Sequence, residues 1–142
     1  MFLLLIHIYN YVLNIAQKFR EFLSSKDFVE IETPKLMAGS SEGGAAVFKL
    51  LYHGQPACLA QSPQLHKQMA ICGGFERVFE VGPVFRAETS RTPRHLCEFT
   101  GLDAEMEIME HYFEVRRTKT RIMLVFHFIW FGLIHCSSSS DG

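Results

Sequence analysis

The chain has 142 residues, of which 48% are hydrophobic and 20% are charged, and its formal net charge is −1. This length suits one globular domain with a core and excludes two domains of ordinary size. The near-neutral charge argues against a dedicated nucleic-acid-binding module, which would carry a basic field. The 4 cysteines are widely spaced without a C-x-x-C pair. Reduced thiols in a cytosolic protein, with no structural metal site, are therefore expected.

Both ends of the chain are apolar. Residues 1–13 have the hydropathy of a signal sequence but lack its basic start and its cleavage site, so secretion is not expected. Residues 122–136 fall short of the about 20 apolar residues that a membrane-spanning helix needs. A peptide anchored in a membrane by its ends is therefore the weakest hypothesis for this chain, and we expect no membrane association.

The first predicted element is an amphipathic helix over residues 12–23, in which apolar side chains recur at a spacing of 3.6 residues and which Ser24 and Ser25 end. Residues 28–33 then alternate between apolar and acidic side chains, which predicts a strand. Pro34 ends that strand because proline has no N–H to donate to a sheet. Residues 39–44 have the glycine and serine content of a mobile loop.

Two short paired strands are predicted at residues 48–51 and 57–60, around a turn at residues 53–56. Ser62 and Pro63 then predict the start of a helix, since a serine oxygen accepts a free N–H and proline fits the first helical position. Gly73 and Gly74 close this helix.

Two faces are predicted on the helix that begins at Pro63. Leu65, Met69 and Cys72 share a stripe that is expected to face the core. Gln64 and Lys67 lie three residues apart on another face and can converge on one ligand.

A strand over residues 77–88, bent at Gly82 and Pro83, is predicted to pair with a strand over residues 99–108. In the second strand Asp103, Glu105 and Glu107 alternate with apolar residues and form a row of carboxylates. Residues 89–97 between the strands are too many for a tight hairpin and are typical of a functional loop.

Each candidate residue also has an ordinary structural explanation. Arg86 suits a carboxylate or a phosphate, but a structural ion pair with Glu88 or Glu105 explains it equally well. A helical lysine such as Lys67 usually faces solvent. The carboxylate row is by default the solvated face of an antiparallel sheet. The order of the motifs carries more information than any one of these residues.

Four segments together resemble the catalytic core of class II aminoacyl-tRNA synthetases of the aspartyl type. Residues 28–36 (FVEIETPKL) resemble the first class II motif, which builds the dimer interface. Residues 41–45 (SEGGA) resemble the loop that closes over the amino acid, and residues 61–68 (QSPQLHKQ) resemble the aspartate-recognition segment. Residues 85–106 resemble the second motif, in its eukaryotic or archaeal form.

The resemblance implies a binding site for aspartate. Lys67 would neutralise the side-chain carboxylate of aspartate, with Asp103 beside it. Arg86, the expected catalytic residue, would bridge the α-carboxylate and the α-phosphate of ATP. The residues expected to hold the ammonium end are Glu42, Ser62 and Gln64.

The resemblance also implies a binding site for ATP. Phe99 would stack on adenine, Glu88 would contact the adenylate region, and Arg94 and His95 would hold the outer phosphates. The full set implied for ATP is Arg86, Ala87, Glu88, Arg94, His95, Leu96 and Phe99. The loop over residues 89–93 would face the acceptor end of tRNA(Asp).

The resemblance implies an α+β fold, part of the antiparallel class II sheet flanked by helices. We expect an apolar extension over residues 1–13, a partial catalytic domain over 14–115, and a divergent apolar tail over 116–142. The family's third motif and its Mg²⁺ ligands are not found in this sequence. The chain is therefore expected to be a part of a cytoplasmic aspartate–tRNA ligase that uses ATP and Mg²⁺ and is inactive alone. It is expected to form a homodimer or to pair with a full-length synthetase. The alternative is a non-catalytic dimerisation partner.

Overall fold

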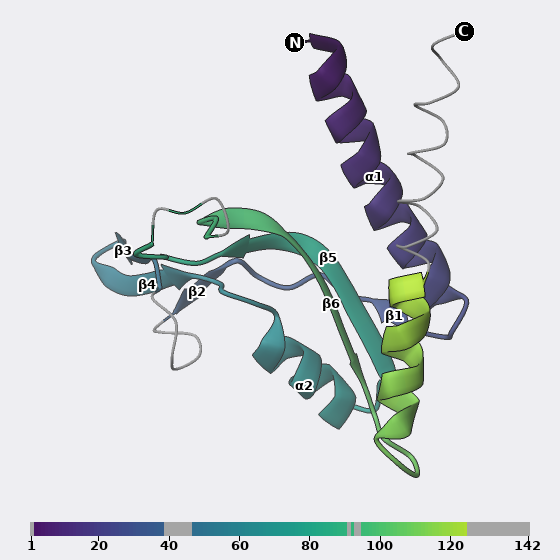
Figure 1. Cartoon of the computed structure of the whole chain (residues 1–142). Coiled ribbons are helices and arrows are strands. Elements are labelled where there is room, and N and C mark those ends of the chain that lie inside the picture. Colours follow the sequence, from purple (N-terminus) through teal and green to yellow (C-terminus); the bar gives the residue numbers. More distant parts are fainter. Residues whose placement is uncertain (1, 39–46, 91, 93–94, 125–142) are drawn as a thin grey trace, which may run out of the picture. The chain divides into compact units, whose positions relative to one another are not determined.

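The computed structural model describes residues 2–38, 47–90, 92 and 95–124. The chain divides into two compact units, one of Phe28–Glu105 and the other of Met1–Asp27 with Met106–Gly142. Figure 1 labels the elements in chain order: α1 (Phe2–Ser24), β1 (Val29–Glu30), β2 (Leu36–Ala38), β3 (Lys49–Tyr52), β4 (Gln55–Leu59), α2 (Gln64–Cys72), β5 (Arg77–Phe85) and β6 (Glu98–Met106).

Helix α1 is longer than the predicted helix, because it begins at Phe2 and not at Val12. No proline or glycine interrupts this stretch, so the apolar N-terminal residues continue the helix. Its end is confirmed: α1 stops at Ser24, and Asp27 then adopts a positive φ of 63°. Phe19 and Leu23 of the predicted apolar stripe are buried.

A further helix occupies residues 113–124 in the same unit as α1. It includes the basic run over residues 116–121. In the part of the chain that the structure describes, no helix is both long enough and apolar enough to cross a membrane.

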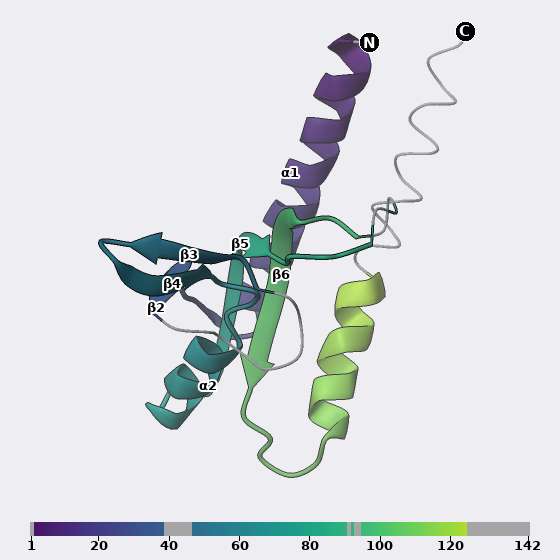
Figure 2. The ribbon, with the colours of Figure 1, turned by 90° about the vertical axis from the view of Figure 1, so that its left-hand side faces the viewer.

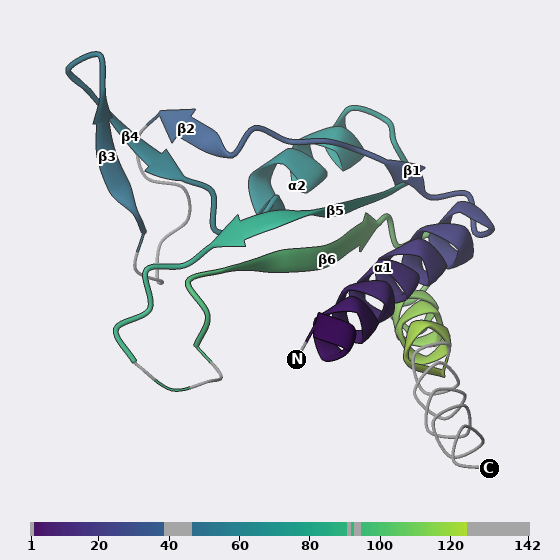
Figure 3. The same ribbon diagram turned by 90° about the horizontal axis from the view of Figure 1, so that it is seen from above.

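The unit Phe28–Glu105 contains a three-stranded sheet in the order β1–β5–β6. Strand β1 pairs with β5 in parallel, with Val29 opposite Val78. Figure 3 shows β5 and β6 running in opposite directions, so the sheet is mixed. The predicted strand over residues 28–33 is shorter than expected, because beyond Ile31 the backbone bonds to a side chain and not to the neighbouring strand.

The second sheet has the order β2–β4–β3, and all its pairings are antiparallel. The predicted pair of strands is confirmed as the β3–β4 hairpin, whose turn lies at His53 and Gly54. Both turn residues have positive φ, 49° and 75°. A two-residue hairpin turn of this kind requires positive φ at both positions, which glycine adopts without strain. Strand β2 was not predicted, because three residues are too few to show a period.

Helix α2 ends as predicted, because Gly73 follows its last helical residue, but it begins one residue later than predicted, with Pro63 just before the helix and not at its first position. The N–H of Gln64 donates to Ser62 Oγ at 3.2 Å. The predicted core stripe is wrong. Leu65 is 46% exposed and Met69 is 68% exposed, and Cys72 is also exposed. The one buried residue of α2 is Lys67, so the helix turns its polar face towards the rest of the unit.

Strands β5 and β6 approach each other closely at Gly101. A Cβ atom at this position would lie 2.7 Å from Cγ2 of the buried Val84, so only glycine fits there. The predicted faces of β6 are exchanged, because Leu102 and Ala104 are exposed whereas Asp103 and Glu105 are half-buried. Helix α2, which lies beside β5 in Figure 2, supplies the positive charge that allows these carboxylates to be covered.

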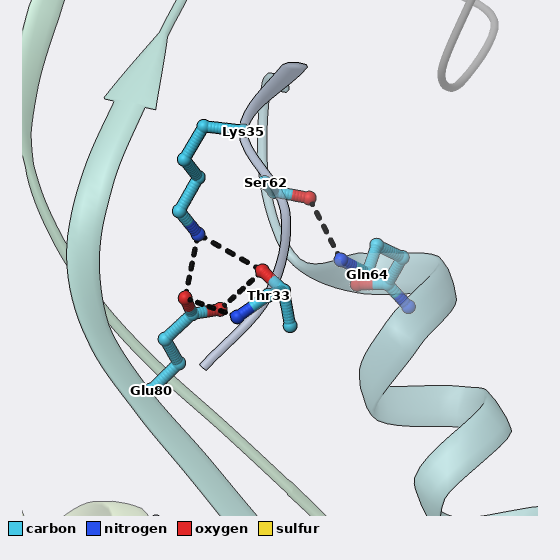
Figure 4. A network of polar contacts seen from close by, with 5 residues as sticks. All are labelled: Thr33, Lys35, Ser62, Gln64 and Glu80. Atoms are coloured by element: carbon cyan, nitrogen blue, oxygen red, sulfur yellow. Dashed lines mark hydrogen bonds and ion pairs between the residues drawn. The ribbon is translucent and has the colours of Figure 1, made fainter. Parts of the chain in front are cut away.

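A buried carboxylate joins β5 to the segment that follows β1. Glu80 accepts hydrogen bonds from the N–H of Thr33 at 3.1 Å and from Thr33 Oγ1 at 2.8 Å (Figure 4). Lys35 Nζ lies 2.5 Å from Glu80 Oε1 and 2.9 Å from Thr33 Oγ1. The donors of Thr33 and Lys35 thus converge on the side chain of Glu80, which is 5% exposed.

The same segment links the two sheets through the main chain. The carbonyl of Lys35 accepts the N–H of Ala60 at 2.9 Å, and the carbonyl of Ala60 accepts the N–H of Phe85 at 3.0 Å. Ala60 directly precedes the segment of residues 61–68, and Phe85 directly precedes Arg86. The segment that contains Lys35, the segment that follows Ala60 and the end of β5 therefore meet at one junction.

Replacing Gly101 by alanine tests the close approach of β5 and β6. The added methyl group overlaps Val84, and overpacking of this kind costs about 1–3 kcal/mol of folding free energy. The urea midpoint, followed by circular dichroism, should fall for Gly101→Ala and change little for the control Thr100→Ala at an exposed neighbour. Equal midpoints for the two variants would contradict the close contact.

Replacing Glu80 by alanine tests the buried network. The change leaves the N–H of Thr33 without its acceptor and removes the carboxylate partner of the Lys35 ammonium, which keeps only Thr33 Oγ1. An unsatisfied buried group costs about 1–3 kcal/mol. We expect a clear loss of stability in urea unfolding, whereas the exposed Glu76→Ala should leave stability almost unchanged. A Glu80→Ala protein as stable as its parent would show that the network contributes nothing.

Candidate functional site

Lys67 forms the centre of the candidate site. It is 5% exposed, and its Nζ contacts Oδ1 of Asp103 and lies 3.1 Å from Oε2 of Glu105. Asp103 and Glu105 are two residues apart on β6, so both side chains leave the same face of the strand. The predicted proximity of Lys67 and Asp103 is confirmed by this contact, and the carboxylate row is not simply a solvated face.

Burial and ion pairing act on Lys67 in opposite directions. Burial lowers the pKa of Lys67, because the charged form loses its hydration, but hydrogen bonds and charges of Asp103 and Glu105 raise it more. Its pKa therefore lies above the ordinary value of 10.5. The stability that these ion pairs contribute is present in full below that pH and is lost only as the pH rises through the higher pKa of the folded state.

The charges around Lys67 do not balance. One ammonium faces two carboxylates, so the three side chains carry a net charge of −1 when all are ionised. The side chains of Asp103 and Glu105 are 29% and 30% exposed, so both retain contact with solvent. An anionic ligand would meet a cation that is already paired.

The start of α2 brings two other predicted residues beside Lys67 in the chain. Ser62 and Gln64 are half-buried, and the N–H of Gln64 donates to Ser62 Oγ (Figure 4). Gln61, just before them, is buried. The segment from Gln61 to Lys67 thus turns several polar side chains inward, which is unusual for a helix start and typical of a binding segment.

Arg86 follows directly after β5 and is exposed. Its N–H donates to the carbonyl of Cys97 at 2.9 Å, and its guanidinium lies 5.4 Å from the centre of the ring of Phe99. Two residues predicted to bind ATP are therefore together at the same end of the β5–β6 pair. Glu105, one suggested ion-pair partner of Arg86, contacts Lys67 instead.

The remaining predicted residues lie in or near the connection between β5 and β6. Glu88, His95 and Leu96 are exposed and Ala87 is half-buried. His95 Nδ1 lies 2.6 Å from Oγ1 of Thr92 within the loop. The predicted residues Glu42 and Arg94 lie outside the described residues.

Sequence reasoning missed three residues of this region as site residues: Lys35, Glu80 and Glu105. A narrow depression connects the two polar clusters, and its lining is Lys35, Pro63, Glu80, Gly82, Val84, Gly101 and Asp103. Glu105 could have been found by its position two residues after Asp103. Nothing in the sequence distinguishes Lys35 or Glu80 from solvent-exposed charges.

Curated relatives of this chain are aspartate–tRNA ligases. The chain is 77% identical over 97 residues to a protein of Arabidopsis thaliana named aspartate–tRNA ligase 1, cytoplasmic, covering 68% of this chain and 18% of that protein. It is 60% identical over 101 residues to the cytoplasmic aspartate–tRNA ligase of Homo sapiens, covering 71% and 20%. The chain thus spans about a fifth of the length of the curated relatives it matches.

Solved structures give the same result for the fold. A putative aspartyl-tRNA synthetase from Leishmania major Friedlin is 48% identical with a TM-score of 0.78, covering 87% of this chain and 24% of that one. Asparaginyl-tRNA synthetase from Pyrococcus horikoshii, complexed with asparaginyl-adenylate, is 36% identical with a TM-score of 0.75, covering 83% and 27%. The expected α+β fold of the class II type is confirmed.

The family model of the tRNA synthetases class II (D, K and N) matches residues 7–128, which is most of the chain. The sequence resemblance, the fold and the relatives therefore all indicate the same family. The chain belongs to the class II tRNA synthetases of this group.

Proposed function

We propose that this chain forms the aspartate-recognition part of the catalytic domain of an aspartate–tRNA ligase. The observation that carries the proposal is Lys67, a buried and protonated lysine at the start of a helix and beside a half-buried aspartate. Such an ammonium suits the side-chain carboxylate of aspartate, and it would reject a neutral side chain that leaves it poorly paired. The names of the curated relatives agree with this substrate.

The proposed reaction joins aspartate to tRNA(Asp) at the expense of ATP, with AMP and pyrophosphate as products. Arg86, the proposed catalytic residue, would hold the α-carboxylate of aspartate against the α-phosphate and stabilise the charge that develops there. The ring of Phe99 beside its guanidinium offers a surface for the adenine. Ser62 and Gln64 would bind the ammonium end of aspartate. The relatives named cytoplasmic support a cytoplasmic location.

Magnesium accompanies ATP in the proposed reaction, where it would neutralise phosphate charge. Among the described residues, no group of three or more histidine, cysteine and acidic side chains is placed to hold a metal ion. We therefore assign no residue of this chain to the ion.

Replacing Lys67 by methionine tests the substrate. The test protein is the Arabidopsis thaliana relative in which the matching 97 residues are replaced by those of this chain, here called the grafted ligase. Lys67→Met removes the charge that pairs with aspartate, and kcat/KM for aspartate should fall about 100-fold, the equivalent of about 3 kcal/mol. The KM for ATP should stay nearly constant in pyrophosphate exchange.

The control is Lys49→Met, which removes an exposed lysine from β3 and should leave both parameters unchanged. Melting curves of both variants report whether the protein is still folded. Equal losses for aspartate and ATP in a folded Lys67→Met protein would show that the lysine is structural, and the proposed substrate would then be wrong.

We also propose that the chain assembles as a dimer. Helix α1 exposes a set of large apolar side chains, and an apolar stripe of this kind is stabilised by a second, identical stripe. Its most exposed members are Tyr9, Leu13 and Ile8, at 68%, 65% and 51%.

The dimer prediction is tested by size-exclusion chromatography with light scattering. The parent chain should elute at twice its mass of 16.3 kDa, and Leu13→Glu should shift it towards the monomer by placing a charge in the apolar contact. The neighbouring exposed Asn14→Glu is the control and should remain dimeric. A monomeric parent at micromolar concentration would contradict the proposal.

A further inference from the structure

The helix over residues 113–124, yellow-green in Figure 2, carries the densest positive charge of the chain. Residues 115–121 (VRRTKTR) hold 4 of the 14 lysines and arginines and no acidic residue. The formal net charge of the whole chain is −1, so this excess of positive charge is local. The helix belongs to the same compact unit as α1, whereas the candidate site for aspartate lies in the other unit.

Three of these four charges share one face of the helix and line a cavity. The cavity has a volume of about 390 Å³, and its lining is Phe113, Arg116, Arg117, Thr120 and Arg121. The five positions are three or four residues apart, so they form a single stripe along the helix. The volume lies within the range of roughly 300–1,000 Å³ that is typical of ligand-binding cavities.

The arginines of this face have no acid to compensate them. Within the part of the chain that the structure describes, no carboxylate forms an ion pair with Arg116, Arg117 or Arg121. In α1 of the same unit, by contrast, Lys18 lies 2.5 Å from Glu21. Like charges one helical turn apart destabilise a helix, so an ordinary solvated face is the less favourable explanation. A bound polyanion would relieve this repulsion.

Exposed aromatic rings lie directly beside the basic face. The ring centres of His111, Tyr112 and Phe113 are separated by 4.4 Å, 4.3 Å and 4.6 Å, and all three side chains are exposed. The guanidinium carbon of Arg116 lies 5.8 Å from the centre of the Phe113 ring. Exposed rings next to arginines form the kind of surface on which unpaired nucleobases stack while their phosphates are neutralised.

We infer that residues 111–113 and the arginine face of the helix, here called the basic-aromatic surface, bind single-stranded RNA. Arg117 and Arg121 contact phosphates, and bases stack on the rings of Tyr112 and Phe113. Any base has a ring face, so the surface accepts RNA without reading its sequence. RNA is the polynucleotide that we name because the chain belongs to a family of tRNA synthetases. The inference does not depend on the proposed recognition of aspartate.

Fluorescence anisotropy of a labelled oligouridylate of about 15 nucleotides tests the inference with the full chain. Three phosphate contacts predict that the logarithm of the binding constant falls with the logarithm of the salt concentration at a slope of about −2. A strand of the same length without bases should bind about tenfold more weakly, because stacking is lost. Equal binding of the two strands, or tighter binding of the matching DNA, would overturn the inference.

Variants of the arginine face test the phosphate contacts. Arg117→Gln should weaken binding about threefold to tenfold and reduce the steepness of the salt dependence by about 0.7. The control Lys49→Gln removes the same charge at an exposed position of the other unit and should change neither value. Circular dichroism reports whether each variant is folded, and Arg121→Gln repeats the test at a second position. Equal losses at Lys49 and at the arginines would mean that only net charge matters, and this result would overturn the inference.

The aromatic rings are tested separately from the charge. Tyr112→Leu should weaken binding about fivefold without altering the salt dependence, because it removes a stacking surface and no charge. The matched control is Tyr52→Leu, since Tyr52 is 56% exposed against 58% for Tyr112 and its ring also lies against a histidine ring. An unchanged affinity in Tyr112→Leu would contradict the stacking.

An anionic membrane is the competing partner for a basic surface with exposed aromatic rings. Vesicles of phosphatidylcholine and phosphatidylserine, sedimented with the chain, distinguish it from RNA. We expect the oligouridylate to prevent any sedimentation of the chain with the vesicles. Sedimentation that an excess of oligouridylate does not reduce would assign the surface to lipid and overturn the inference.

Discussion

The unit Phe28–Glu105 depends on the carboxylate of Glu80, which is buried and must be paired. Its partners come from one short segment, Thr33 to Lys35, and this segment in turn holds Ala60 by a main-chain hydrogen bond. Because Ala60 also accepts the N–H of Phe85, a single buried charge fixes the junction from which both binding segments start. A protein that buries an acid inside the sheet must hold these segments in register, since any other arrangement leaves the charge unsatisfied.

The same electrostatic requirement explains why α2 packs by its polar side. Lys67 is covered only because Asp103 and Glu105 compensate its charge, and these carboxylates lose solvent only because Lys67 is there. Hydrophobic burial contributes little to this contact, as the exposure of Leu65 and Met69 shows. Ion pairing, more than core formation, accounts for the orientation of the helix.

Local signals in the sequence predicted the elements well and their covered faces poorly. Ser62 and Pro63 indicated the start of α2 to within one residue and Gly73 its end, because the start and end signals of a helix depend on neighbouring residues alone. The exposure of Leu65 was not predictable, since a periodic pattern shows which residues share a face and not which face is covered. The pairing of Lys67 with Asp103 followed from the family resemblance, whereas Glu105 needed the register of β6 against α2.

The coupling of Lys67 with two acids restricts how this scaffold can change its substrate. The family model covers proteins for aspartate, lysine and asparagine, whose side chains differ in charge. Loss of Lys67 alone would leave two half-buried carboxylates without their cation. Loss of Asp103 or Glu105 alone would remove one of the two negative charges that pair with Lys67. Each single substitution in this cluster gives a less stable protein. A change of amino-acid preference at this site should therefore require compensating substitutions on α2 and β6 together.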